Sequence, residues 1–343
     1  MARIYFVTNR KPDRKRNPTG FTTELSPDGV ANLRYGYADV AGADLDEHEI
    51  HVASERWRPD RHRGGLQPGA RFGSDAIMAA VRREMAERGR DTLVYVHGYN
   101  VTFAEALTTG ARLQANLSGY GEGRGLNVAV FSWPSDGSAM PFLAYGNDRQ
   151  EARASGPAFA RAFLKLVDFL RAATPEDECD QHVHLLAHSM GNYLIRHAVQ
   201  EIRGHYPSRP PRIFDQVVLA AADEDDDTFE TDDGLRLLPR MARRVNVYFN
   251  RGDLALEVSD KTKANPDRLG TNGPRLPHQV PAKVVQLDCT AVVSGLTEHS
   301  YHVDNERVTS DMCETLAGVE ADRVAGREYV PDSNRYRALK DPA

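Results

Sequence analysis

Residues 182–191, HVHLLAHSMG, constrain the fold of this chain more than any other stretch. An apolar run with the character of a buried strand ends abruptly at Ser189, and a helix-like run over 192–202 follows at once. Small residues, Ala187 and Gly191, lie two positions before and two positions after the serine. A crowded turn between strand and helix needs small flanking residues, and it lifts the serine hydroxyl above the sheet edge. The stretch favours a nucleophilic serine, although a serine that only caps the helix would show a similar pattern.

Size and composition narrow the class of protein. The 343 residues suffice for one large α/β domain or two small ones, and a net charge of -6 gives no reason to expect a nucleic-acid partner. No apolar run approaches the ~18 residues of a membrane span, and the first residues lack a signal pattern. Three cysteines, Cys179, Cys289 and Cys313, show no metal-ligand spacing. We expect a cytoplasmic protein with reduced thiols that acts on a small molecule without a metal or cofactor; its oligomeric state is left open.

Strand-like and helix-like runs alternate along the chain. Strands are expected at 3–8, 33–40, 92–96, 127–133, 182–188, 214–221, 244–249 and 282–287. Helices are expected from Ser74 onward and at 103–117, 155–171, 192–202, 229–242 and 306–316, with irregular connections between the first two strands and over 44–73. This alternation predicts an α/β fold with a doubly wound, mostly parallel sheet that helices cover on both faces.

No repeat or linker-like stretch divides the chain, so residues 1–325 are expected to form a single domain. The segments 135–155 and 254–281 are candidate cap or rim segments, and the second has too little apolar surface for a hydrophobic lid. The polar residues 326–343 are expected to form a loosely held tail, and the basic cluster 10–16 a solvated loop.

The strand ends predict where chemistry would occur. In a doubly wound sheet the carboxyl ends of the strands share one edge, and sites form there. Ser189, Asp253 and His299 follow three such strands, in the chain order of serine, acid and histidine that α/β-hydrolases use. His299 would take the serine proton, and Asp253 would hold the histidine tautomer and stabilise the imidazolium. His302 remains an alternative base and Asp223 an alternative acid.

The strand 92–96 ends in His97, Gly98, Tyr99 and Asn100, which precede the serine turn in the chain. Backbone N–H groups of Met190 and of Tyr99 or Asn100 are expected to form an oxyanion hole, where one donor is worth about 3–4 kcal/mol to a transition state. His97 is expected to brace this loop rather than react. Candidate pocket-lining residues are His97, His188, Trp133 and Tyr145.

Several motifs in order carry a resemblance to a known family. They are LVYVHGYNVTFAEAL, VAVFSWPSDG, YGNDRQEA, LLAHSMGNYLI, VVLAAADEDDDTF, YFNRGDLAL, RLG and EHSY. Over about residues 3–316 the chain resembles the bacterial α/β-hydrolase family of unknown function often labelled "esterase/lipase superfamily". The resemblance implies an α/β-hydrolase fold with Ser189, Asp253 and His299 at the matching positions, and it favours His299 over His302. It implies no substrate, because the family has no agreed one.

Together these features predict a serine hydrolase that cleaves a carboxylic ester or thioester through an acyl-enzyme. One alternative is an acyltransferase with the same nucleophile, which added alcohol or amine acceptors would reveal. The other is an inactive hydrolase-fold binding protein, which would fail to react with a fluorophosphonate probe. The acidic run 223–227 lacks the glycine and distal glutamate of an EF-hand, so it does not predict calcium.

Overall fold

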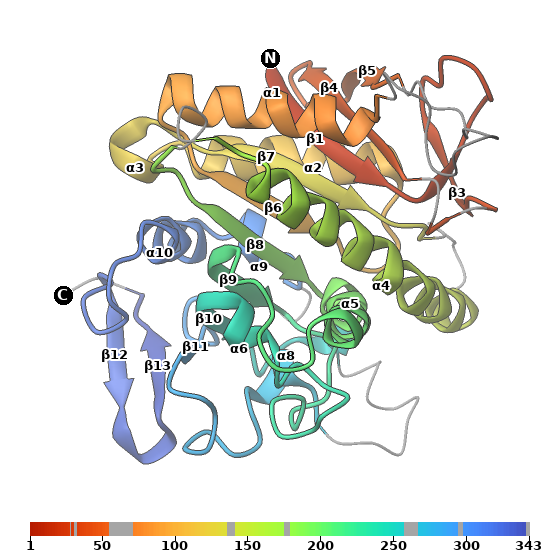
Figure 1. Ribbon diagram of the computed structural model, residues 1–343. Coiled ribbons are helices and arrows are strands. Elements are labelled where there is room, and N and C mark those ends of the chain that lie inside the picture. Colours follow the sequence, from red (N-terminus) through yellow and green to blue (C-terminus); the bar gives the residue numbers. More distant parts are fainter. Residues whose placement is uncertain are drawn as a thin grey trace.

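Figure 1 shows a computed structural model of the chain, which describes residues 1–27, 29–30, 33–54, 71–135, 141–174, 179–256, 267–293 and 298–340, without the side chains of 141–144. The strands are β1 (Ala2–Thr8), β2 (Arg10–Pro12), β3 (Phe21–Leu25), β4 (Arg34–Ala41), β5 (Glu47–Val52), β6 (Thr92–Val96), β7 (Asn127–Ser132), β8 (Val183–His188), β9 (Phe214–Ala220), β10 (Ala242–Phe249), β11 (Val284–Asp288), β12 (Arg327–Val330) and β13 (Arg335–Ala338). The helices are α1 (Gly73–Arg88), α2 (Phe103–Asn116), α3 (Tyr120–Gly123), α4 (Pro141–Arg171), α5 (Met190–His205), α6 (Leu238–Met241), α8 (Leu269–Asn272), α9 (Tyr301–Asp304) and α10 (Glu306–Leu316), with a short 3₁₀ turn η2 (Pro331–Ser333).

One 11-stranded sheet organises the molecule, in the order β12-β13-β11-β10-β9-β8-β6-β7-β1-β4-β5. The strands from β1 through β7, β6, β8, β9 and β10 to β11 are parallel to their neighbours. At one edge β4 and β5 continue the sheet in antiparallel fashion, and at the other β13 is parallel to β11 while β12 is antiparallel to β13. The predicted α/β class with a mostly parallel sheet is confirmed.

Helices cover both faces of the sheet because each strand supplies two apolar faces. Along β6, Val94 and Val96 face a core shared with α1, α4 and α5, whereas Leu93 and Tyr95 face a core shared with α2, α9 and α10.

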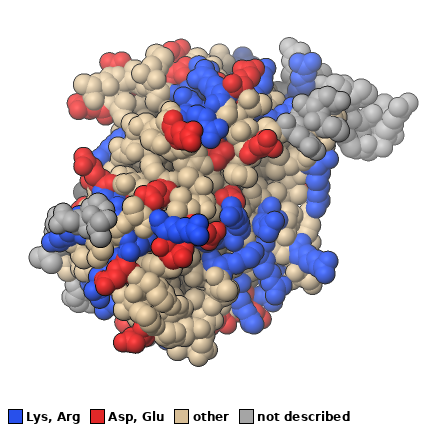
Figure 2. All heavy atoms as spheres, turned by 90° about the vertical axis from the view of Figure 1, so that its left-hand side faces the viewer, with Lys and Arg blue, Asp and Glu red and all other residues tan. Residues whose placement is uncertain are grey.

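On the outer surface, acidic and basic side chains lie beside one another over much of the face in Figure 2. Among the described residues, no helix is long and apolar enough to cross a membrane.

Three segments expected to lack regular structure form strands instead. The first connection forms the β2–β3 hairpin, and β5 lies within the stretch 44–73, where it pairs with β4 at the sheet edge. The supposed tail forms the β12–β13 hairpin, which extends the sheet beyond β11. The side chain of Arg327 in this hairpin is 1% exposed and pairs with Asp311 of α10 at an Nη2–Oδ1 distance of 2.6 Å, so an ion pair anchors the hairpin. Short polar edge strands such as these carry no clear hydrophobic alternation.

Three helix predictions also need correction. Ser74 does not cap α1; the cap position is Phe72. The helix expected at 229–242 exists only as α6, and turns occupy most of the rest. Conversely, α4 begins at Pro141 rather than near residue 155. Its Gly156 does not end the helix: a Cβ there would lie 2.5 Å from the Cβ of His197, so the glycine permits close packing of α4 on α5.

The candidate cap segments are partly described. Residues 136–140 and 257–266 lie outside the described residues. Residues 141–155 are helical, and α8 lies against the ends of β9 and β10, where Gly270 N donates to Ala222 O at 2.9 Å and Asn250 N donates to Gly270 O at 3.0 Å. The described part of 254–281 is thus bound to the strand ends.

Candidate active site

The serine turn is a strained and tightly held connection between β8 and α5. Ser189 has φ 51° and ψ −124°, a conformation that non-glycine residues adopt only where surrounding contacts enforce it. Its amide donates to Ala220 O at 3.0 Å, and its carbonyl accepts from Asp223 N at 3.1 Å. The side chain of Asn192 donates to the carbonyls of both Ser189 and Ala187, at 3.0 and 3.1 Å. These four hydrogen bonds hold the turn in its strained conformation.

Ser189 occupies the cap position of α5, yet its side chain makes no capping hydrogen bond. A capping serine would have extended backbone angles and would bond an amide of the first turn, so the capping interpretation does not account for this residue. The first amides of a helix also have no partner within the helix, and Met190 provides the first of them.

Two glycines are required by close approach around the serine. A Cβ on Gly191 would lie 2.7 Å from the carbonyl oxygens of Val96 and His97. A Cβ on Gly98 would lie 2.8 Å from the Cβ of Ser189. The end of β6 therefore packs directly on the serine turn, as expected for a strand that contributes to the same site.

Asp253 and His299, which are 46 residues apart, form a direct pair. His299 Nδ1 donates to Asp253 Oδ2 at 2.7 Å, and the other oxygen, Oδ1, accepts from the amides of Ala255 and Leu256 at 3.1 and 3.3 Å. The Asp253 side chain is 1% exposed and the His299 side chain 20% exposed. The carboxylate is thus held in one orientation, and the imidazole keeps an edge open to solvent.

His188 links this pair to the serine turn. Its Nε2–H donates to the carbonyl of His299 at 3.2 Å, and the centroids of the two imidazole rings are 4.8 Å apart. His302 also stacks on His188, with ring centroids 4.1 Å apart, and is only 1% exposed. Burial, reinforced by the neighbouring His299, lowers the pKa of His302 to about 3, and burial lowers the pKa of His188 well below its usual value. Both rings are neutral packing groups, and His302 does not pair with Asp253.

The candidate oxyanion strand end is braced by a buried polar cluster around His97. Trp133 N–H donates to His97 Nε2 at 3.2 Å, so Nδ1 carries the proton and donates to Gly98 O at 2.9 Å. The indole of Trp133 stacks on His97 and donates to the His97 carbonyl at 2.9 Å. Burial, together with the charge of Arg10, lowers the pKa of His97 to about 3. His97 braces the loop as expected, whereas Trp133, which is 0% exposed, does not line an open pocket.

Arg10 and Asp148 hold the oxyanion loop itself. Arg10 is fully buried, and its Nη2 donates to Val101 O at 2.6 Å. The prediction that Arg10 lies in a solvated loop is therefore wrong. The carboxylate of Asp148 accepts the amide of Asn100 at 3.1 Å and the hydroxyl of Ser135. The Asn100 amide is therefore engaged by Asp148, and the prediction that it could serve the oxyanion hole is wrong for this structure. The other predicted donor in the turn is the amide of Tyr99.

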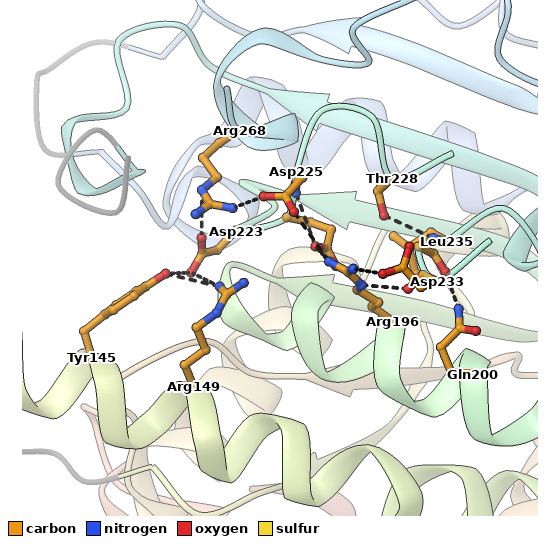
Figure 3. A network of polar contacts seen from close by, with 12 residues as sticks. Tyr145, Arg149, Arg196, Gln200, Asp223, Asp225, Thr228, Asp233, Leu235 and Arg268 are labelled. Atoms are coloured by element: carbon orange, nitrogen blue, oxygen red, sulfur yellow. Dashed lines mark hydrogen bonds and ion pairs between the residues drawn. The ribbon is translucent and has the colours of Figure 1, made fainter. Parts of the chain in front are cut away.

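Tyr145 and Asp223 belong to a polar network at the rim (Figure 3). Tyr145 OH donates to Asp223 Oδ2 at 2.6 Å, and its ring lies 5.9 Å from that of Tyr99. Arg268, which is 0% exposed, contacts Asp223 Oδ1 at 3.4 Å and Asp225 Oδ1 at 2.6 Å. The carboxylate of Asp223 is thus engaged by a tyrosine and an arginine, and it does not pair with His299.

The structure therefore gathers most of the predicted residues at one edge of the sheet. Within the described residues, no hydrogen bond joins the Ser189 hydroxyl to His299. Sequence reasoning assigned no role in the site to Arg10, Asp148 or Asn192, although the motifs YGNDRQEA and LLAHSMGNYLI contain Asp148 and Asn192. In the described part of the chain, no group of three or more His, Cys, Asp or Glu side chains is arranged to hold a metal ion.

A mostly parallel sheet with a strained serine at a strand-to-helix turn defines an α/β-hydrolase. Residues 74–317 match the family described as "Alpha/beta hydrolase of unknown function (DUF900)", and the chain belongs to this family.

The individual proteins that this chain resembles share 27% or less of its sequence. The chain is 27% identical over 181 residues to the "Uncharacterized protein alr1448" of Nostoc sp. (strain PCC 7120), in a match that covers 46% of this chain and 44% of that protein. Among solved structures it is similar to a "putative cell surface hydrolase" of Lactobacillus plantarum, with 13% identity, a TM-score of 0.36 and coverage of 68% of this chain and 95% of the other. It is also similar to the acylaminoacyl peptidase of Pyrococcus horikoshii, with 10% identity, a TM-score of 0.32 and coverage of 83% and 47%. At these TM-scores the similarity supports no conclusion about activity.

Proposed function

We propose that this protein is a serine hydrolase that cleaves a carboxylic ester or thioester through an acyl-enzyme on Ser189. The observation that carries the proposal is the 2.7 Å hydrogen bond from His299 Nδ1 to Asp253 Oδ2, beside the strained serine turn. Because Nδ1 carries the proton, Nε2 is the basic nitrogen, and it can accept the proton of an attacking hydroxyl.

The reaction begins when Ser189 Oγ attacks the substrate carbonyl and His299 Nε2 takes the serine proton. The tetrahedral oxyanion is bound by the backbone N–H groups of Met190 and Tyr99. His299 then returns its proton to the leaving alkoxide or thiolate, which leaves an ester on Ser189. Water, deprotonated by His299, hydrolyses that ester and releases the carboxylic acid. Asp253 stabilises the imidazolium in both halves of the cycle.

The mechanism requires the Ser189 hydroxyl and His299 Nε2 to come within hydrogen-bond distance when substrate binds. Such bonds are commonly long before the Michaelis complex forms. Because the imidazole of His299 keeps a solvent-exposed edge, its ring has room to make this approach. The backbone at His299 is held close to the serine turn by the hydrogen bond from His188 Nε2 to the His299 carbonyl.

Hydrolysis of p-nitrophenyl esters of increasing acyl length tests the proposal. Ser189→Ala should lower kcat by about 10⁶, whereas Ser118→Ala, at an exposed position, should leave kcat unchanged. A Ser189→Ala protein that folds normally and keeps most of the activity would refute the assignment. Product analysis with and without an added alcohol separates hydrolysis from acyl transfer.

A further inference from the structure

A cavity lies on one face of the sheet, outside the residues of the serine turn. It has a volume of about 480 Å³ and lies between one face of the sheet and the helices α1 and α4. Residues of α1 and α4 pack on the same face of the sheet. In the view of Figure 1, β1 and β7 lie between these two helices. Its volume is in the range of small-molecule sites, roughly 300–1,000 Å³. Among the described residues that line it, none belongs to the Ser189, Asp253 and His299 cluster.

The walls of this cavity are aromatic and aliphatic over most of its length. Tyr5, Ala129 and Phe131 line it from the sheet, and Ile77, Phe159 and Phe163 line it from the two helices. A cavity with such walls does not hold water well and instead binds apolar molecules. The body of any ligand must therefore be apolar.

One end of the cavity is different, because polar groups gather there. It lies at the amino ends of β6 and β8, where Thr92, Asp180, Gln181 and His182 line the cavity; Arg82 of α1 also lines the cavity. Thr92 shares the strand face of Val94, which also lines the cavity, and it is 3% exposed. Its hydroxyl has no hydrogen-bond partner among the described residues. A buried hydroxyl left without a partner is costly, so this one marks the place for a hydrogen-bonding ligand group.

The length of the cavity sets the size of the ligand. Thr92 pairs with Asn127 and Val96 pairs with Phe131, so the lining residue Phe131 lies four residues farther along the sheet than Thr92. Four residues of strand span about 13 Å, which is the length of an extended alkyl chain of roughly ten carbons.

We propose that this cavity binds a single-chain amphiphile, with its alkyl chain along the sheet and its hydrogen-bonding head group at Thr92. Both a fatty acid and a fatty alcohol have this chemistry. Arg82 would favour a carboxylate head, whereas Asp180 would oppose it, so the two ligands are the separate arms of the test. The proposal concerns a site apart from the serine turn and does not depend on the hydrolase activity.

Displacement of the fluorescent probe N-phenyl-1-naphthylamine from the full-length protein tests the site. The probe should bind, and dodecanoate or dodecanol should displace it.

Ala162→Trp adds an indole to the cavity wall from α4 and should weaken binding of the probe and of both amphiphiles at least tenfold. Ala154→Trp, at an exposed position of the same helix, should leave binding unchanged. If Ala162→Trp does not fold, Ala129→Leu fills the cavity from the sheet side and should have the same effect. Absence of binding to the wild type, or equal binding by a folded filled variant, would overturn the proposal.

A second variant tests the head-group position. Thr92→Val removes the unpartnered hydroxyl at nearly constant volume, so it should weaken dodecanol or dodecanoate about three- to tenfold while the affinity for the probe stays within twofold. Unchanged affinity for both amphiphiles would contradict the placement of the head at Thr92. Loss of probe binding after a fluorophosphonate has blocked Ser189 would show that the ligands occupy the active site instead, and would also overturn the proposal.

Discussion

Asp253→Asn is the most informative single substitution at the proposed site. The amides of Ala255 and Leu256 both donate to Oδ1 of this residue, so the asparagine oxygen should take that position. Its NH₂ group would then face His299 Nδ1, where the carboxylate oxygen now lies 2.7 Å away. Two donors cannot face each other, so His299 must move its proton to Nε2.

With Nε2 protonated, His299 could no longer accept the proton of Ser189. Loss of the correct tautomer in a triad of this kind lowers kcat by about 10⁴, which corresponds to about 5.5 kcal/mol of barrier. The steady-state rate with a p-nitrophenyl ester measures this directly, and circular dichroism checks that the variant is folded. Asp223→Asn is the matched control, because that carboxylate bonds Tyr145 and Arg268 instead of His299. A small loss for Asp253→Asn, or an equal loss for Asp223→Asn, would refute the reasoning.

Three further predictions follow from other parts of the site. Gly98→Ala should lower kcat/KM by about 10²-fold, because its Cβ would lie 2.8 Å from the Cβ of the nucleophile and displace the loop; wild-type kinetics would contradict this. Asp148→Ala should lower kcat at least tenfold by releasing the Asn100 amide, whereas Asp148→Asn, which keeps an acceptor, should recover most of the rate; equal rates in the two variants would argue against the role of that acceptor. The folded-state pKa values of His97 and His302, about 3, lie below the unfolded value of 6.5, so the unfolded chain binds more protons and stability falls as pH drops below 6.5. Each histidine should cost about 2 kcal/mol of unfolding free energy between pH 7 and pH 5; urea titrations measure this, and no decrease would contradict the buried neutral state.

The sequence predicts the parts of this molecule that depend on local pattern. The strand that ends at Ser189, the small residue at Gly191 and the chain order of Asp253 and His299 are all visible without coordinates. They are visible because a strand-to-helix turn and parallel connections impose fixed residue types at fixed places.

The supports of the site depend instead on contacts between distant segments. Arg10 lies in a run of basic residues whose composition is typical of a solvated loop. Its side chain is nevertheless buried and donates to the carbonyl of Val101, which is 91 residues away in the sequence. Asp148 lies in the polar motif YGNDRQEA, and nothing in the neighbouring sequence indicates that it accepts the amide of Asn100. The β12–β13 hairpin has the composition of a tail, and one of the contacts that attach it to the rest of the chain is the ion pair between Arg327 and Asp311. Such pairings follow from the packing of the whole chain and leave no local periodicity to detect.

Reaction with a fluorophosphonate, followed by peptide mapping in a mass spectrometer, tests the central claim most directly. The account predicts one stoichiometric phosphonyl adduct on the peptide that contains Ser189, no adduct in Ser189→Ala, and much slower labelling in His299→Ala. A folded wild-type protein that remains unlabelled, or that is labelled at another residue, would contradict the claim that Ser189, His299 and Asp253 act together as a nucleophilic site.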